Sequence, residues 1–194
     1  MSYDTLYEAV VIGASAGGLH AVSSLLDALP RGFDIPVILV QHRMKEDNSL
    51  LEEVLQKRCM LTVRQAEEKE PIAKGMIYTA PPGYHLLIEQ DRSFALNCDP
   101  PVGYSRPSID VLFESAAAAY GKSLMAVILT GANADGAEGT RQVRRKGGTT
   151  IAQDPGTAEH PFMPQAAINT GAVQHILRLE AIGVFLKNMN KLNQ

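Results

Sequence analysis

The chain has 194 residues, of which 45% are hydrophobic and 20% charged, and its formal net charge is -3, with 18 Lys and Arg against 21 Asp and Glu. This balance argues against nucleic-acid binding, and no apolar run approaches the ~20 residues of a membrane span, so we expect no membrane insertion. Two cysteines outside any CxxC pattern and the absence of a cationic signal region predict a cytoplasmic protein that forms one domain over residues 1–194.

Short β-branched runs alternate with longer amphipathic segments in the first third of the chain. Apolar runs at 8–12, 35–40 and 61–65 predict buried strands. Apolar residues at helical spacing predict helices over 18–29 and 48–58. This order of strands and helices predicts a parallel sheet with right-handed crossovers.

The middle of the chain has a different pattern. Three short strand candidates at 76–79, 84–89 and 94–97 are separated by turn residues and predict an antiparallel excursion or hairpin attached to the sheet. The alternation then returns, with predicted helices at 109–120, 137–146, 164–169 and 181–190 and predicted strands at 125–129, 149–152 and 175–177. We therefore expect an α/β fold with a short antiparallel addition.

Residues 13–18, GASAGG, lie directly between the first predicted strand and the first predicted helix. A dinucleotide-binding loop would read G-x-G-x-x-G, but Ser15 occupies the second glycine position, and the second strand is followed by Gln41 and His42 instead of a ribose-binding acid. The same residues fit G-x-S-x-G, a nucleophile elbow that projects a serine hydroxyl from a sharp turn. A tight glycine turn with an incidental serine is the alternative interpretation.

A serine nucleophile needs an imidazole base and a carboxylate that orients it, and in a parallel sheet such groups gather at the carboxyl ends of the strands. His42 comes shortly after the second strand, and Asp135 lies just beyond the strand at 125–129. The pattern predicts a triad of Ser15, His42 and Asp135. Taken singly, His42 could bond a backbone group, and Asp135 could be the N-cap of the helix that begins near Ala137.

His160 is the alternative base. It lies in a Pro-rich loop at 154–164 after a predicted strand, and it would give the chain order Ser, Asp, His of ordinary α/β-hydrolases. The other three histidines are less well placed, because His20 falls inside the first helix, His85 among the middle strands, and His175 in or beside the last strand.

Several separated segments occur together in the order found in one known family: IGASAGG, VQHR, RPSIDVLF from Arg106, VILTGANADGA, residues 150–153, and FMP with AIN at 162–164 and 167–169. Over about residues 9–179 the chain resembles the catalytic domain of bacterial chemotaxis protein-glutamate methylesterases, the CheB family. The resemblance implies a doubly wound, mostly parallel sheet with helices on both faces. It also places the family's nucleophile, base and acid on Ser15, His42 and Asp135.

The family hydrolyses γ-glutamyl methyl esters on the cytoplasmic helices of methyl-accepting chemoreceptors, and many members also deamidate receptor glutamines. The resemblance therefore implies a hydrolase that needs no cofactor and no metal. It places five candidates on the oxyanion or substrate-binding side of the site: Ala16, Gly17, Arg106, Ala132 and Met163. Arg106 could help to receive an acidic receptor surface, or it could form an ordinary surface salt bridge.

The chain departs from the family pattern in three places. Ala16 stands where the family commonly has Thr, and Ala132 stands where it often has Met, in GANADG against GMGNDG. Family members typically carry an N-terminal receiver domain, whereas 14 residues precede Ser15 here. A free-standing esterase, regulation by a separate partner and an excised domain all fit this observation. The two alanines favour the alternative function, a non-catalytic module that binds a peptide or an anion.

Overall fold

The computed structural model describes residues 6–43 and 50–192. Its main sheet is wholly parallel, with the strand order β3-β4-β2-β1-β7-β8-β9. The strands are β1 (Ala9–Ala14), β2 (Val37–Gln41), β3 (Thr62–Gln65), β4 (Met76–Thr79), β7 (Leu124–Ile128), β8 (Thr149–Gln153) and β9 (His175–Leu177). This parallel sheet confirms the predicted α/β class.

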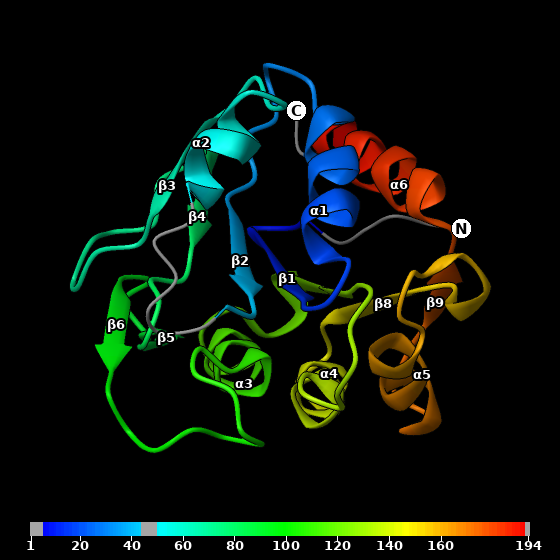
Figure 1. Cartoon of the computed structure of the whole chain (residues 1–194). Coiled ribbons are helices and arrows are strands. Elements are labelled where there is room, and N and C mark those ends of the chain that lie inside the picture. Colours follow the sequence, from blue (N-terminus) through cyan, green and yellow to red (C-terminus); the bar gives the residue numbers. More distant parts are fainter. Residues whose placement is uncertain (1–5, 44–49, 193–194) are drawn as a thin grey trace.

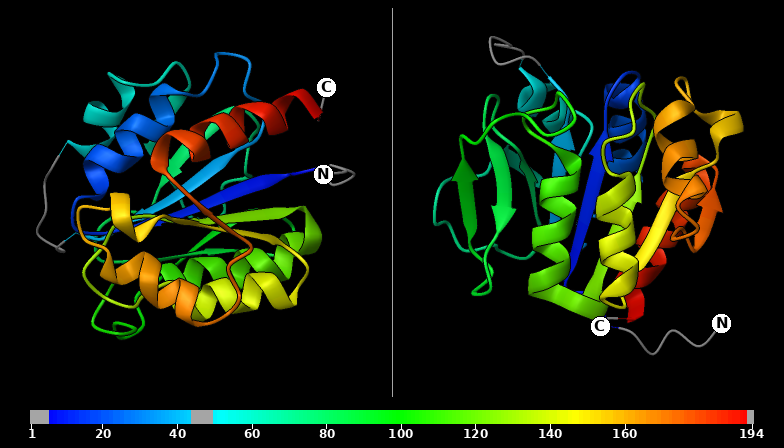
Figure 2. Two further views of the ribbon diagram at one scale, coloured as in Figure 1. Left: turned by 90° about the vertical axis from the view of Figure 1, so that its right-hand side faces the viewer. Right: turned by 90° about the horizontal axis from the view of Figure 1, so that it is seen from below.

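Helices cover both faces of the sheet (Figures 1 and 2). One layer contains α1 (Gly18–Asp27), α2 (Leu51–Gln56) and α6 (Leu179–Leu192), and the other contains α3 (Ile109–Tyr120), α4 (Ala137–Arg145) and α5 (Phe162–Asn169). Two short 3₁₀ segments, Gly121–Ser123 and Pro155–Thr157, precede β7 and follow β8. The doubly wound arrangement is therefore also confirmed.

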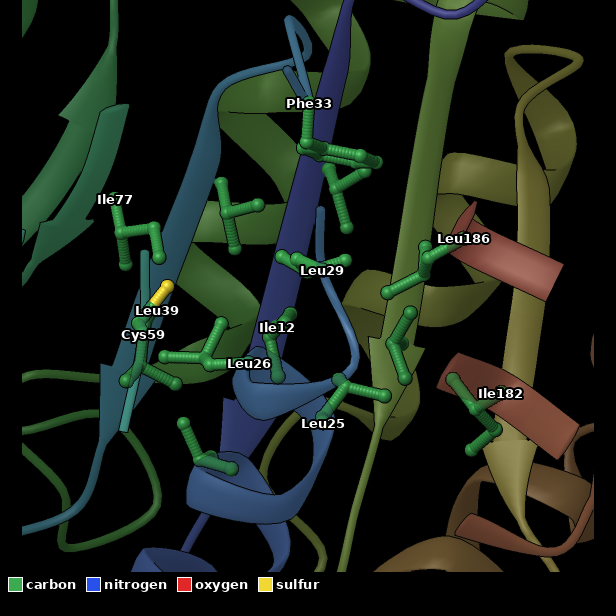
Figure 3. Packing of buried hydrophobic residues seen from close by; sticks show 14 of the residues in the cluster. Ile12, Leu25, Leu26, Leu29, Phe33, Leu39, Cys59, Ile77, Ile182 and Leu186 are labelled. Atoms are coloured by element: carbon green, nitrogen blue, oxygen red, sulfur yellow. The ribbon is translucent and has the colours of Figure 1, made fainter. Parts of the chain in front are cut away.

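The central strands are apolar along their whole length because both faces of the sheet are covered. Every residue of β1 and β7 is buried. Alternate residues of β1 enter different cores: Val10 and Ile12 pack with α1 and α6, and Val11 packs with α3. In Figure 3, Ile12 lies beside Leu25 and Leu26 of α1, within the first of these cores.

The prediction for the middle strands is partly wrong. Residues 76–79 form β4, which lies in the main sheet and pairs in parallel with both β2 and β3. Only β5 (His85–Ile88) and β6 (Phe94–Asn97) form an antiparallel pair, which lies beside α3. The turn residues between these segments favoured an antiparallel excursion or hairpin, but Ile77, Tyr78 and Thr79 are buried and extend the covered sheet.

Helix boundaries differ from the prediction by a few residues. The helix expected over 48–58 is described from Leu51 to Gln56, and residues 48 and 49 lie outside the described residues. α5 begins at Phe162 with Pro164 inside its first turn, where the missing N–H of proline costs no helical bond. α6 begins two residues before the expected position, at Leu179. Within residues 6–43 and 50–192, no helix combines the length and apolarity needed to cross a membrane.

The strand order brings three loops together. From β1 the chain passes to one side to form β2, and it later returns to the other side to form β7. The carboxyl ends of β2, β1 and β7 are therefore neighbours, at the point where the strand order reverses. Open α/β sheets bind ligands at this point.

Candidate active site

Ser15 lies on a sharp turn between β1 and α1. Its N–H donates to the carbonyl oxygen of Thr130 at 3.0 Å, and its own carbonyl oxygen accepts the N–H of Gly18 at 2.8 Å. Gly17, the N-cap of α1, has a φ of 73°, which lies in the left-handed region that favours glycine. This local geometry explains the glycines of GASAGG and projects the serine at the end of β1.

The three side chains predicted to meet do so across neighbouring loops. His42 Nδ1 lies 3.2 Å from Ser15 Oγ, and His42 Nε2 lies 2.7 Å from Asp135 Oδ2. Since the Asp135 carboxylate accepts a hydrogen bond, Nε2 carries the proton and Nδ1 presents its lone pair to Ser15. The backbone N–H of His42 donates to the Ala14 carbonyl oxygen at 2.9 Å and holds residue 42 beside the end of β1.

Asp135 is anchored by the N-terminus of α3. Oδ2 accepts the Ile109 N–H at 2.7 Å, and Oδ1 accepts the Ser108 hydroxyl at 2.8 Å and the Asp110 N–H at 3.0 Å. The alternative that Asp135 caps the helix near Ala137 is wrong, because Gly136 is the N-cap of α4 and no side chain caps it. The carboxylate instead satisfies the free N–H groups at the start of α3.

These contacts determine the ionisation of Asp135. Its side chain is 2% exposed, and burial alone would raise its pKa. The hydrogen bonds from His42 and from the N–H groups of Asp110 and Ile109 outweigh burial and hold the pKa of Asp135 below its ordinary value. Asp135 is therefore a stable anion beside the imidazole at neutral pH.

A second carboxyl, that of Asp110, lies next to Asp135, to which the Asp110 backbone N–H donates a hydrogen bond. Burial raises the pKa of Asp110 to about 6; the negative charge of Asp135 adds to this, and the N–H of Gly139 opposes it. The Gly139 N–H donates to Asp110 Oδ1 at 2.6 Å and links the start of α3 to α4. Asp110 thus supports the site from the far side of Asp135.

Polar side chains that the sequence analysis did not single out hold the serine turn. Gln41 Nε2 donates to the Ser15 carbonyl oxygen at 2.8 Å, and Thr130 Oγ1 donates to the Ala16 carbonyl oxygen at 3.0 Å. Ser108 stands at the N-cap of α3, a position that its residue type could have indicated. Its bond to Asp135, 27 residues away, has no local sequence signal.

The five other candidates lie in different environments. Within the described chain, no acceptor is found for the N–H groups of Ala16 and Gly17, so both are available to an incoming oxygen. Ala132 is exposed and lines a cavity of about 450 Å³ with His160 and Phe162. Met163 is 1% exposed, packs under Gly131 and does not line that cavity.

Arg106 lines a second cavity of about 510 Å³ together with Ser15, His42 and Asn133. Its guanidinium donates to the carbonyl oxygens of Cys98 at 2.7 Å and Asp99 at 2.9 Å. The surface salt bridge considered for it is not found among the residues that the structure describes. Since carbonyl groups carry no net charge, its positive charge remains available at this cavity.

The rival base does not contact the serine. The His160 imidazole lies 3.6 Å from Glu159 Oε1, while the His160 N–H and carbonyl oxygen bond Thr130 Oγ1 and the Gly131 N–H. His160 therefore holds the loop after β7 through its backbone. His85 is buried, where its Nδ1 accepts the Ser108 N–H at 3.2 Å. Across 6–43 and 50–192, no three His, Cys, Asp or Glu side chains cluster as metal ligands.

Comparisons with known proteins agree on one family. The model of the family described as CheB methylesterase matches residues 10–186. A protein of Leptospira interrogans, provisionally named protein-glutamate methylesterase/protein-glutamine glutaminase, is 47% identical over 97% of this chain and 98% of its own length. A protein-glutamate methylesterase/protein-glutamine glutaminase of Anaeromyxobacter dehalogenans is 39% identical over 95% of this chain, which spans 54% of that relative.

A solved structure agrees as well. The CheB methylesterase catalytic domain of Thermotoga maritima superposes with a TM-score of 0.90 at 32% sequence identity. The match covers 94% of this chain and 98% of that domain.

Proposed function

Because the chain belongs to the CheB methylesterase family, we propose that it is a serine hydrolase that cleaves γ-glutamyl methyl esters on the cytoplasmic helices of chemoreceptors, in the cytoplasm. The observation that carries this proposal is the hydrogen-bonded chain from Ser15 through His42 to Asp135. A nucleophile, a base and an ionised orienting group in contact are what acyl transfer requires.

In the first half of the reaction, His42 Nδ1 takes the proton of Ser15 Oγ as the oxygen attacks the ester carbonyl carbon. The carbonyl π electrons move to the carbonyl oxygen, and the Ala16 N–H, on the turn just before α1, stabilises the resulting oxyanion. Asp135 keeps its charge and stabilises the imidazolium. The buried position of Asp135 makes this charge interaction stronger than it would be in water.

In the second half, the oxyanion collapses and methanol leaves with the proton from His42. A water molecule then attacks the carbonyl carbon of the glutamyl-enzyme while His42 takes its proton. Collapse of this second oxyanion breaks the bond to Ser15 Oγ, which regains a proton from His42 as the free glutamate side chain leaves. A glutamine substrate would follow the same path, with ammonia as the leaving group. Every proton passes through one imidazole, so the path needs no metal and no cofactor.

The substrate also has to be recognised. Arg106 places a positive charge at the cavity that contains Ser15 and His42, and no carboxylate of the described residues pairs with it. This charge suits a receptor surface rich in glutamate. Ala132 provides an apolar surface on the other side of the loop after β7. A separate protein partner could regulate access to this edge of the sheet.

The test is methanol release from membranes that carry radiolabelled methylated chemoreceptors. We expect release by the parental protein and none above background by Ser15→Ala. Release at the parental rate by Ser15→Ala would refute the role of Ser15. The alternative function is a module that binds a peptide or an anion without catalysis. The observation that favours it is that Ala16 and Ala132 stand where the family has larger side chains. It predicts receptor binding by both proteins without methanol release by either.

A further inference from the structure

We propose that Asn133 is a further catalytic residue of this site and that its side-chain amide donates a hydrogen bond to the oxyanion formed on Ser15. This inference rests on the proposed function, because it requires Ser15 to be the nucleophile. Asn133 lies in the loop between β7 and α4, two residues before Asp135. It lines the same cavity of about 510 Å³ as Ser15 and His42.

The orientation of the Asn133 amide is fixed by its own backbone. Oδ1 accepts the Asp135 N–H at 3.1 Å, a contact that only the oxygen of the amide can make. Nδ2 therefore faces the other way, toward the catalytic pair. It lies 3.4 Å from His42 Nδ1 and 3.4 Å from Ser105 Oγ. An N–H donor is thus held beside the atom that receives the Ser15 proton.

The contact with His42 changes during the reaction. In the resting state, the Asn133 N–H and the Ser15 hydroxyl approach the same lone pair on Nδ1, and the hydroxyl is closer, at 3.2 Å. When the proton of Ser15 Oγ moves to Nδ1, that nitrogen becomes a donor and no longer accepts from Asn133. The carbonyl oxygen of the ester gains its negative charge in the same step. The freed N–H can then bind the oxyanion.

The Asn133 N–H thus changes its acceptor from His42 Nδ1 to the oxyanion. Such a change accelerates a reaction, because the hydrogen bond is stronger in the transition state, where the negative charge develops, than in the ground state. No proton leaves Asn133, and its role is a hydrogen bond to the oxygen that carries the displaced π electrons. The neighbouring loop residues, Ala132 and Ala134, have no polar side chain, and neither has Ala16 on the serine turn. Asn133 therefore supplies a side-chain donor that the turn itself lacks.

The inference is tested by the rate at which a fluorophosphonate reacts with Ser15, since its phosphoryl oxygen occupies the oxyanion position. Asn133→Asp keeps an oxygen that accepts the Asp135 N–H but replaces the amide donor with a negative charge, whereas Asn133→Ala removes both the oxygen and the donor. We expect both variants to lower the maximal rate about 100-fold, with a half-saturating probe concentration within about threefold of the parental value. Rates are compared on the alkaline plateau of each variant's pH profile.

Ser105→Ala is the matched control, because it removes the other contact of Nδ2 but keeps the donor and its anchor to Asp135. We expect Ser105→Ala to react at close to the parental rate. A parental rate for Asn133→Ala would overturn the inference. A slow Asn133→Ala beside a parental Asn133→Asp would also overturn it, because the turn at Asp135 and not the donor would then matter. If Asn133→Ala does not fold, the nearly isosteric Asn133→Asp still overturns the inference if it reacts at the parental rate.

One more readout separates a donor to substrate from a group that acts through the base. Above the pH of half-maximal rate, Asn133→Ala should remain about 100-fold slower than the parental protein, whereas a loss confined to lower pH would assign the effect to His42 and contradict the inference. Failure of the proposed function looks different. In that case the parental protein itself would not be labelled at Ser15, and both proposals would fall.

Discussion

Replacing Asp135 with asparagine tests the structure at its most connected side chain. Each carboxylate oxygen accepts two hydrogen bonds, Oδ1 from Ser108 and Asp110 and Oδ2 from His42 and Ile109. An asparagine has one oxygen, so its NH₂ group must face either the Asp110 N–H or the Ile109 N–H. One backbone donor at the start of α3 is therefore left without an acceptor.

The magnitudes follow from these contacts. A buried unsatisfied N–H costs about 1–3 kcal/mol, and the lost negative charge at a helix N-terminus costs about 0.3–1 kcal/mol. Relief of the repulsion that Asp110 feels from Asp135 offsets a part of this. We expect Asp135→Asn to lower the free energy of unfolding by about 2 kcal/mol. The turnover number should fall about 10⁴-fold, because His42 loses the anion that fixes its tautomer.

The assay combines urea unfolding with methanol release on one preparation of protein. Ser108→Ala is the control, since it removes one hydrogen bond to Oδ1 but leaves the charge and the contact with His42. It should lose about 1 kcal/mol of stability and keep turnover within about tenfold of the parental value. Turnover by Asp135→Asn within tenfold of the parental protein would refute the reasoning, whatever its stability.

Three further predictions concern other groups at this edge of the sheet. His42→Ala should lower turnover about 10⁴-fold, whereas His160→Ala should stay within about tenfold; a larger loss at His160 in the same methanol assay would reverse the assignment of the base. Asp110 has a pKa raised from 3.8 to about 6, so the folded state binds its proton more tightly than the unfolded chain does, and stability falls as pH rises from about 4 to about 6. Asp110→Asn keeps an oxygen that accepts the Gly139 N–H but cannot carry the carboxylate charge. We therefore expect its free energy of unfolding to be about 1–2 kcal/mol higher than that of the parental protein at pH 7.5 and nearly equal at pH 4. Equal urea midpoints at pH 7.5 would contradict this. Arg106→Ala should raise KM for methylated receptor about fivefold with little change in kcat, and an unchanged KM would remove Arg106 from substrate recognition.

The elements that local pattern determines could be predicted from the sequence. The serine turn is one, because its glycines, the apolar run before it and the amphipathic run after it are contiguous. The contact of Ser15, His42 and Asp135 could also be predicted, because each follows a strand and parallel strands bring their carboxyl ends to one edge.

The remainder depends on contacts between distant segments. The place of β4 in the parallel sheet depends on pairing with β2 and β3, and its four residues do not show this. The anchoring of Asp135 by α3 joins residues more than 20 positions apart and reverses the simpler expectation that it caps the next helix. The position of Asn133 beside His42 likewise follows from the path of one loop, which residue types alone do not define.

Trapping the covalent intermediate tests the mechanism most directly. A receptor peptide with a glutamate γ-methyl ester would be mixed with the protein, quenched in acid within one turnover, digested and examined by tandem mass spectrometry. The glutamyl adduct should be found on the peptide that contains Ser15 and should be absent from Ser15→Ala. An adduct on another residue, or methanol release with no adduct while hydrolysis of the acyl group is rate-limiting, would contradict nucleophilic attack by Ser15.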